Sequence, residues 1–449
     1  MSTPDQVQFS NNPVEGTQAE SELVIFRSEL TEYNPSSNKF IRINLPVSDK
    51  AWIDWSDSVL SLKFTNRSAD SAGDSADAKV NPTLSDLIKS VSVLNSQGEQ
   101  IEYVNNYNLI SAVMDDYSYG NNHKASVEQI LAGGSPDGNP ASSDSVFVLG
   151  SAGATVADGG NIVLVDRLMT GFTSGQYLLP LGYLVGQACS LVIELEDAST
   201  ALTCETPANC TAGYKVENVQ IRAKQIRFNA MFNESFERTL AEAGNVGINY
   251  ITESYLHNQA SIPASTGAGV TNIPFSTNPR SAKYILATIR AEADITDVSK
   301  HSIRNRSGGS IQEYSWEISG KTLPSQPIQV NNTANAQNYA QAYAQVLDCL
   351  GQIGAINHNT LVSTAGTNTL FYSDTIGTAC KFVAGLPLED FNSATNPSVY
   401  SGANLTTVGQ MSFRPNFRAT VSNAHRVDFF TSIDMSIYFT VGGRLYSVK

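Results

Sequence analysis

The sequence predicts an all-β chain made of two tandem domains, each a β-sandwich or a jelly roll, with a few short helices. Short stretches of alternating apolar and polar residues recur along the chain, whereas helical spacing is confined to a few segments. Many short strands with few helices are typical of sandwiches and jelly rolls. A chain of 449 residues also exceeds what one ordinary core accommodates, so two domains are expected.

The first half contains strands whose alternation is plain. In Phe40–Leu45, Ile41, Ile43 and Leu45 share one face, and a period of two predicts a half-buried strand. Residues 60–64 repeat this pattern. Residues 87–103 predict two strands joined by a hairpin turn at 95–98, which ends in a glycine that tolerates positive φ.

A helix and a long polar loop come next. Four residues share one helical face and Gly120 ends the predicted helix: Tyr107, Ile110, Met114 and Tyr117. Residues 120–160 are rich in Gly, Ser, Asn and Asp and predict an outward-facing loop. Strands are then expected at 191–195 and 219–228, with a bulge between Ala223 and Ile226.

After a predicted linker helix at 233–243, capped by Asn233 or Ser235 and closed by Gly244, the same order of elements begins again. Strands are predicted at 284–290, 314–318, 411–413, 417–421 and 433–441. A second helix is predicted from Tyr339 to Ile353, ending at Gly354, and a polar loop follows at 355–378. A Leu-Pro-Leu triplet follows the loop in each half, starting at Leu179 and Leu386. The repeated order predicts a duplicated domain.

The composition argues against a nucleic-acid-binding protein. The net charge is −14, and Arg27 is the first basic residue, so the N-terminal segment is not a basic arm that could neutralise phosphates. Charged residues make up only 16% of the chain. A surface poor in charge suits a molecule that buries much of its outside against its own copies, and it equally suits a secreted β protein with polar loops.

The cysteines and the apolar stretches suggest a reduced protein without a membrane span. Five cysteines without a C-x-x-C pair argue against a disulfide framework and a zinc site. Cys204 and Cys210 are near neighbours, but reduced thiols and intracellular folding are expected. No secretory signal is recognised, and the most apolar stretch, 178–193, is too short and too interrupted to cross a bilayer.

Candidate catalytic residues are few, and each has a simpler structural explanation. The five histidines are scattered without metal-ligand spacing, so neither a metal nor a cofactor is predicted. Asp115 and Asp116 are predicted to lie on a solvated helix face, because adjacent helical residues point in different directions. Trp52 and Trp55, with nearby Asp54 and Asp57, are predicted as a partly buried cluster at the start of a strand. We therefore expect no catalytic site.

The order of elements resembles that of the double jelly-roll major capsid proteins of tailless icosahedral DNA viruses. That family includes adenovirus hexons and the major capsid proteins of algal giant viruses, virophages and membrane-containing phages. The segments that carry the resemblance are 40–46, 57–62, 91–100, 103–117, 233–243 and 385–391. The chain lacks the very long tower insertions of hexons, which suggests a compact tile.

The resemblance implies two eight-stranded jelly rolls and a structural role in the virion shell, with host-cell assembly. The expected division is an N-terminal arm at 1–37, a first roll at 38–231, a linker helix at 232–244 and a second roll at 245–449. Homotrimers would form pseudo-hexagonal capsomers. Their partners would be neighbouring capsomers, minor capsid and vertex proteins and, in some members, an internal membrane, without sequence-specific nucleic-acid binding.

Two other classes of function fit the same features. A glycan-acting hydrolase of two jelly rolls would have carboxylates in a cleft between them, and residues 52–57 are its only support. A viral spike or vertex adhesion protein would share the β pattern but not the symmetry. For the capsid protein, residues 23–33 of the arm are expected to dock, and deletion of residues 1–22 is expected to spare the trimer and impair shell assembly.

Overall fold

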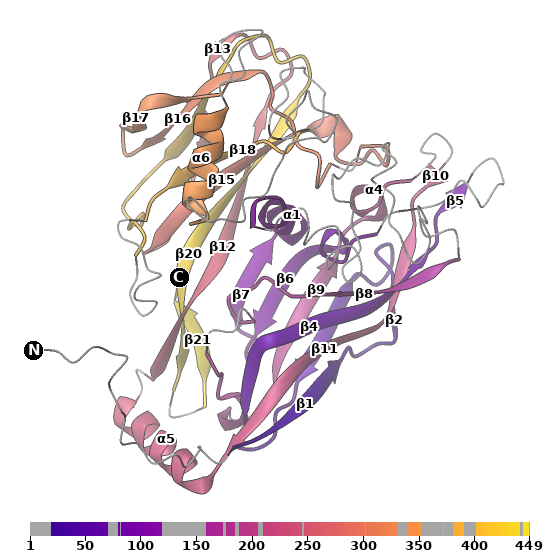
Figure 1. Cartoon of the computed structure of the whole chain (residues 1–449), viewed down its shortest axis with the longest axis vertical. Coiled ribbons are helices and arrows are strands. Elements are labelled where there is room, and N and C mark those ends of the chain that lie inside the picture. The colour runs from indigo at the N-terminus through magenta and orange to yellow at the C-terminus, as the bar shows by residue number, and fades with distance from the viewer. Residues whose placement is uncertain are drawn as a thin grey trace, which may run out of the picture.

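The computed structural model places the chain in two β-rolls connected by a helix (Figure 1). It describes residues 19–70, 80, 82–118, 159–173, 177–184, 188–204, 210–244, 247–300, 302–330, 339–351, 371, 380–389, 401–440 and 443–448. The polar loops predicted at 120–160 and 355–378 lie almost entirely outside these residues, as does most of the arm before Ala19.

The first roll consists of two main antiparallel sheets, whose strands come from distant parts of the sequence, and a two-stranded sheet of β5 and β10. Its strands are β1 (Ala19–Arg27), β2 (Glu32–Tyr33), β3 (Phe40–Leu45), β4 (Trp52–Asn66), β5 (Ala69–Asp70), β6 (Ile88–Leu94), β7 (Gln100–Asn105), β8 (Asn161–Asp166), β9 (Cys189–Leu195), β10 (Cys210–Thr211) and β11 (Tyr214–Phe228). One sheet has the order β1-β11-β4-β8 and the other β3-β9-β6-β7. Leaving aside the two-residue strands, the first sheet holds the first, eighth, third and sixth strands, which is the interleaved order of a jelly roll.

The second roll repeats this order. Its strands are β12 (Ile248–Ile262), β13 (Gly269–Val270), β14 (Ile273–Phe275), β15 (Ala282–Ala291), β16 (Ile311–Ile318), β17 (Lys321–Gln329), β18 (Val383–Pro387), β19 (Met411–Phe417), β20 (His425–Phe439) and β21 (Leu445–Val448). One sheet has the order β12-β20-β15-β18, and the other has β13-β19-β16-β17, with β14 also on β19. Along both sheet paths the strands of the second roll therefore have counterparts in the first, so that β12 matches β1 and β20 matches β11, while β21 is an additional strand that pairs with β20.

The clearest sequence patterns correspond to strands of the structure. In β3, buried and exposed residues alternate along the whole strand, as its sequence predicts. The hairpin of β6 and β7 turns at 95–98, with Gly98 at φ 82°. A register shift in the pairing of β11 with β4 falls at Ala223, where the predicted bulge begins. The predicted pair of strands at 411–413 and 417–421 is wrong, because β19 is a single strand that ends at Phe417.

Strand β1 lies inside the segment predicted as an N-terminal arm. It pairs with β11 from Ala19 to Arg27 and forms the first strand of the first roll. Phe26 and Tyr33 are both buried in the core, so the segment 23–33 docks through these two rings, whereas Leu23, Ile25 and Leu30 remain exposed. The cut after residue 22 would therefore remove the first four residues of a strand and leave its remainder.

Helices occupy the connections between strands. They are α1 (Tyr107–Ser118), α4 (Ala198–Ala201), α5 (Ala230–Ala243) and α6 (Ala340–Cys349), with 3-10 turns η2 (Ser85–Leu87), η5 (Leu181–Tyr183) and η6 (Glu292–Asp294). The linker helix α5 starts earlier than predicted, because the Asn229 side chain accepts a hydrogen bond from the backbone N–H of Phe232 at 2.9 Å and caps it. Gly244, at φ 57°, closes it as predicted. Helix α6 is shorter than predicted and is followed by Gly351 at φ 64°.

Cys204 and Cys210 form a disulfide, which corrects the expectation of reduced thiols. Val80 pairs with Cys204, and Cys210 pairs with Asp70, so both cysteines are held beside the same region of the first roll. Their Cα atoms lie 6.4 Å apart, within the range for a disulfide. The other three cysteines take no part in a disulfide and are buried.

Candidate functional site

The inter-roll interface is where α1 and β7 of the first roll meet β12 and β20 of the second. In Figure 1, α1 lies between the two rolls, at the end of the first roll that faces β12 and β20. Strands β7 and β12 are neighbours but belong to different sheets, so side chains and not a shared ladder join them. This interface holds the two rolls together, and it gathers buried polar groups from both.

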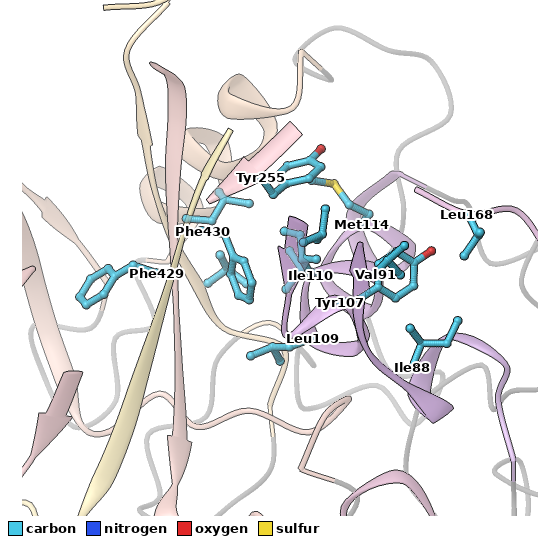
Figure 2. Packing of buried hydrophobic residues seen from close by; sticks show 14 of the residues in the cluster. Ile88, Val91, Tyr107, Leu109, Ile110, Met114, Leu168, Tyr255, Phe429 and Phe430 are labelled. Carbon is cyan, nitrogen blue, oxygen red and sulfur yellow. The ribbon is translucent and has the colours of Figure 1, made fainter. Parts of the chain in front are cut away.

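Apolar side chains form the centre of the inter-roll interface (Figure 2). Ile110 and Met114, one helical turn apart on α1, point toward Phe430 of β20 and Tyr255 of β12. All four are buried and belong to one continuous cluster that includes the cores of both rolls. The helix periodicity seen in the sequence therefore reflects burial on two sides, by its own roll and by the next.

Asp115 and Asp116, predicted to be solvated, are ion-paired across the interface. Asp116 is 2% exposed, and its Oδ2 accepts a hydrogen bond from Nη2 of Arg306 at 2.6 Å. Nζ of Lys381 lies 3.7 Å from its other oxygen. Asp115 accepts from Arg304 at 3.1 Å. The adjacent carboxylates do point in different directions, as predicted, but each meets an arginine of the second roll.

Arg304 also binds the first roll through η2. Its Nε lies 3.1 Å from Oδ2 of Asp86, and its Nη2 donates to Ser85 Oγ at 3.1 Å. The Asp86 side chain is fully buried and that of Arg304 is 4% exposed. A buried charge is strongly destabilising unless an opposite charge lies close to it. These ion pairs therefore favour one position of the second roll against the first.

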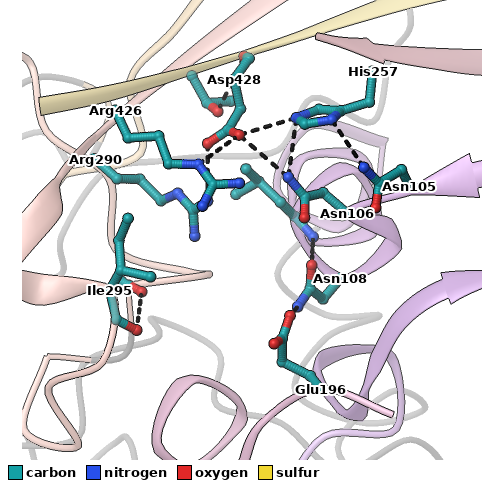
Figure 3. A network of polar contacts seen from close by, with 12 residues as sticks. Asn105, Asn106, Asn108, Glu196, His257, Arg290, Ile295, Arg426 and Asp428 are labelled. Atoms are coloured by element: carbon teal, nitrogen blue, oxygen red, sulfur yellow. Dashed lines mark hydrogen bonds and ion pairs between the residues drawn. The ribbon is translucent and has the colours of Figure 1, made fainter. Parts of the chain in front are cut away.

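A second polar network crosses the interface at the start of α1 (Figure 3). Nε2 of His257 lies 3.0 Å from Oδ1 of Asp428 and 3.0 Å from Nδ2 of Asn106, while its Nδ1 lies 3.3 Å from Nδ2 of Asn105. Nη2 of Arg290 donates to Asp428 at 2.8 Å. Burial alone would raise the pKa of Asp428, but the Arg290 charge and its hydrogen-bond partners hold that pKa well below its usual range.

Glu102 of β7 is the centre of a third buried polar contact between the two rolls. Its carboxylate accepts hydrogen bonds from the backbone N–H groups of Gly171 and Phe172, at 2.7 and 2.9 Å, and from Ser254 Oγ of β12 at 2.6 Å. Glu102 is fully buried. Its donors compensate for the loss of water, so this carboxylate has a structural explanation.

The tryptophans considered for sugar stacking are packed in the first roll. Trp52 is 6% exposed and contacts Phe232 and Phe236 of α5 edge-on, so it anchors the linker helix. Trp55 is 2% exposed and packs against Phe26 and Phe172. The side chain of Asp57 nearby is 83% exposed, so the cluster at the start of β4 is partly buried as predicted, and neither ring is available to a glycan.

Within the residues that the structure describes, no group of three or more His, Cys, Asp or Glu side chains is arranged to hold a metal ion. His257 belongs to the interface network, and His425 is buried, with Nδ1 2.8 Å from the Asn423 carbonyl oxygen. His123, His301 and His358 lie outside the described residues. Among the described residues, no helix is both long and apolar enough to span a membrane.

A small pocket of about 270 Å³ opens beside the His257 network. Its lining comes from both rolls and comprises Tyr103, Asn105, Leu256, His257, Asn258, Ser276, Thr277 and Asn278. This lining contains no Asp or Glu, so the paired carboxylates needed for glycoside hydrolysis are not found in it.

Comparison with solved structures identifies the fold. The chain is similar to the capsid of PBCV-1 virus, with a TM-score of 0.60 and 10% identity over 97% of this chain and 98% of that one. It is similar to the Faustovirus major capsid protein, with a TM-score of 0.60 and 8% identity over 98% and 92% of the two chains. Similarity to the Sputnik virophage structure has a TM-score of 0.57 and 9% identity over 100% and 92%.

At such low identity these likenesses concern the fold, and the chain has the double jelly-roll fold. No protein-family model matches the sequence. A comparison with characterised protein sequences likewise finds no match.

Proposed function

We propose that the chain is the structural major capsid protein of an icosahedral virus, located in the virion shell and assembled as trimeric pseudo-hexagonal capsomers. The observation that carries this proposal is the repeated roll. Both rolls have the same strand order, and the inter-roll interface fuses them side by side into one continuous core. Three copies would then present six similar rolls around an axis, which suits hexagonal packing.

The division of the chain is part of the same proposal. Helix α5 would mark the boundary between the domains, with the second roll at 245–449 as predicted from the sequence. The first roll would extend back from residue 38 to β1, because β1 supplies one edge of its sheet. The segment before Ala19 remains the proposed arm, which would contact neighbouring capsomers, minor capsid and vertex proteins, or a membrane under the shell.

The rival functions are less well supported. The hydrolase relied on residues 52–57, and both tryptophans there are buried. The interface carboxylates described above are held by arginines, a lysine, backbone N–H groups or hydroxyls, which leaves them no evident catalytic task. A spike protein would share the fold, and only its assembly would differ.

Light scattering of the purified full chain tests the proposal. A mass of three copies is expected, and negative-stain electron micrographs should show flat plates of hexagonal outline. A chain that stays monomeric at high concentration would contradict a capsid role. An elongated trimeric rod would favour the spike.

A further inference from the structure

The sheet β12-β20-β15-β18 of the second roll has its outer face covered by the first roll. On β20, Asp428 and Phe430 point to this outer face, since they alternate with the core residue Phe429. Asp428 is bound there by Asn106, and Phe430 faces Ile110 of α1. All of these β20 side chains are fully buried within the single chain.

The counterpart sheet of the first roll, β1-β11-β4-β8, has no such cover from the residues that the structure describes. On β1, Leu23 and Ile25 alternate with the buried Phe26 and are 62% and 45% exposed. They stand opposite Lys224 and Arg222 of β11, which are also exposed. Neither of these two cations has an ion pair within the part of the chain that the structure describes. The face therefore combines apolar side chains with unpaired positive charge.

Helix α6 occupies in the second roll the place that α1 occupies in the first, between the fifth and sixth strands. Helix α1 is buried on both sides, whereas α6 packs on β18 and leaves its other side exposed. Ala340, Ala344 and Asp348 lie on that side, four residues apart, so they form one stripe along the helix. Small side chains permit close approach, and the stripe ends in a carboxylate.

We infer that α6 of one copy covers the outer face of β1 and β11 in the next copy, just as α1 covers β12 and β20 within the chain. The inference rests on the proposed capsid function and names the surfaces that meet. Asp348 would face Arg222 and Lys224, repeating the way α1 carboxylates face arginines of the second roll. Because the two surfaces differ, the contact is head-to-tail, and three such contacts close a ring.

Strand β17 disfavours a contact in which the sheets of two copies join edge to edge, so the proposed contact is made by side chains. It is the edge strand next to α6, and it contains Pro324 and Pro327. Proline lacks an N–H for a ladder and protects an edge against pairing. The internal interface is built in the same way, since β7 and β12 lie together without sharing a sheet.

Three variants of the full chain test the inference by light scattering across a concentration series. Leu23→Asp with Ile25→Asp places charge on the apolar part of the β1 face, and Ala344→Arg obstructs the α6 stripe. Val270→Asp is the matched control, because Val270 is 59% exposed on β13, at the edge of its sheet opposite β17. All of these side chains are exposed in the single chain, so unchanged thermal unfolding of the monomer is expected.

The β1 variant and the α6 variant should each raise the concentration at which trimers form by at least about tenfold, while the control stays trimeric like the wild type. The inference is overturned if both interface variants form trimers as readily as the wild type, or if the control dissociates equally. A wild-type chain that is itself monomeric overturns the proposed function. If the wild type is a trimer and neither the β1 variant nor the α6 variant weakens it, only the proposed contact is overturned.

Discussion

Removing the charge of Asp116 should destabilise the fold far more than removing an exposed charge. Asn in place of Asp116 keeps the size of the side chain and eliminates the carboxylate that faces Arg306 and Lys381. These two cations are 1% and 3% exposed, so water cannot replace the missing charge. Breaking a buried pair in this way costs about 3–5 kcal/mol, because the remaining charge stays desolvated.

The loss is measured as the change in the free energy of unfolding in urea, with fluorescence and far-UV circular dichroism followed together. Glu242→Gln is the matched control: Glu242 pairs with Arg238 within α5, and their side chains are 68% and 82% exposed. Exposed pairs contribute little, so the control should unfold like the wild type.

A loss below about 1 kcal/mol for Asp116→Asn would refute the reasoning. It would mean that water or a rearranged partner reaches Arg306, and that the inter-roll interface is not a dry, charge-matched contact. A separate unfolding transition of one roll in the variant would instead support the role of Asp116 in joining the rolls.

Three further predictions follow from single residues. Burial holds the pKa of His425 below its usual range, so the folded state binds a proton less readily than the unfolded state. The free energy of unfolding should therefore be highest above about pH 6.5 and should decrease as the pH drops below that value. His425→Gln should reduce this decrease in unfolding experiments between about pH 7 and 5. Thiol titration in denaturant without reductant should find three thiols, because Cys204 and Cys210 are joined, and five would contradict the disulfide. Gly402→Ala should lower the unfolding midpoint, because its Cβ would lie 2.5 Å from the Ala282 carbonyl carbon, whereas Gly409→Ala, with open space around it, should not; equal midpoints would contradict this packing.

Strands with one dry and one wet face could be predicted from the sequence. In β3, Ile41, Ile43 and Leu45 are buried and the residues between them are exposed, so local alternation and tertiary burial agree. The same holds for the hairpin of β6 and β7, because its turn needs a glycine at a fixed place. These elements depend on neighbours within a few residues, which a single sequence displays.

Strands whose surroundings come from the other roll escaped prediction. The fifteen residues of β12 do not alternate between buried and exposed, since one side meets its own roll and the edge meets β7. Ser254 and His257 are polar positions that contact the first roll. Ser254 donates a hydrogen bond to Glu102, and His257 lies beside Asn105, each 152 residues away in the sequence. Strand β17 was not predicted because it contains two prolines. Prolines are compatible with an edge strand, but in a sequence they usually indicate a loop.

Periodicity and turn chemistry along the chain were enough to predict the class of fold and much of the duplicated order of elements, although the two Leu-Pro-Leu triplets are not equivalent, since Leu179 precedes β9 and Leu386 lies in β18. The surroundings of the charged residues, in contrast, became apparent only from the three-dimensional fold. Asp115 and Asp116 were predicted to lie on a solvated helix face, but Asp116 is buried, and both are ion-paired because Arg304 and Arg306 come from the second roll. Whether a carboxylate is solvated or ion-paired depends on which residues lie next to it in the folded chain. Those residues can be far away in the sequence, so no local sequence pattern predicts the pairing.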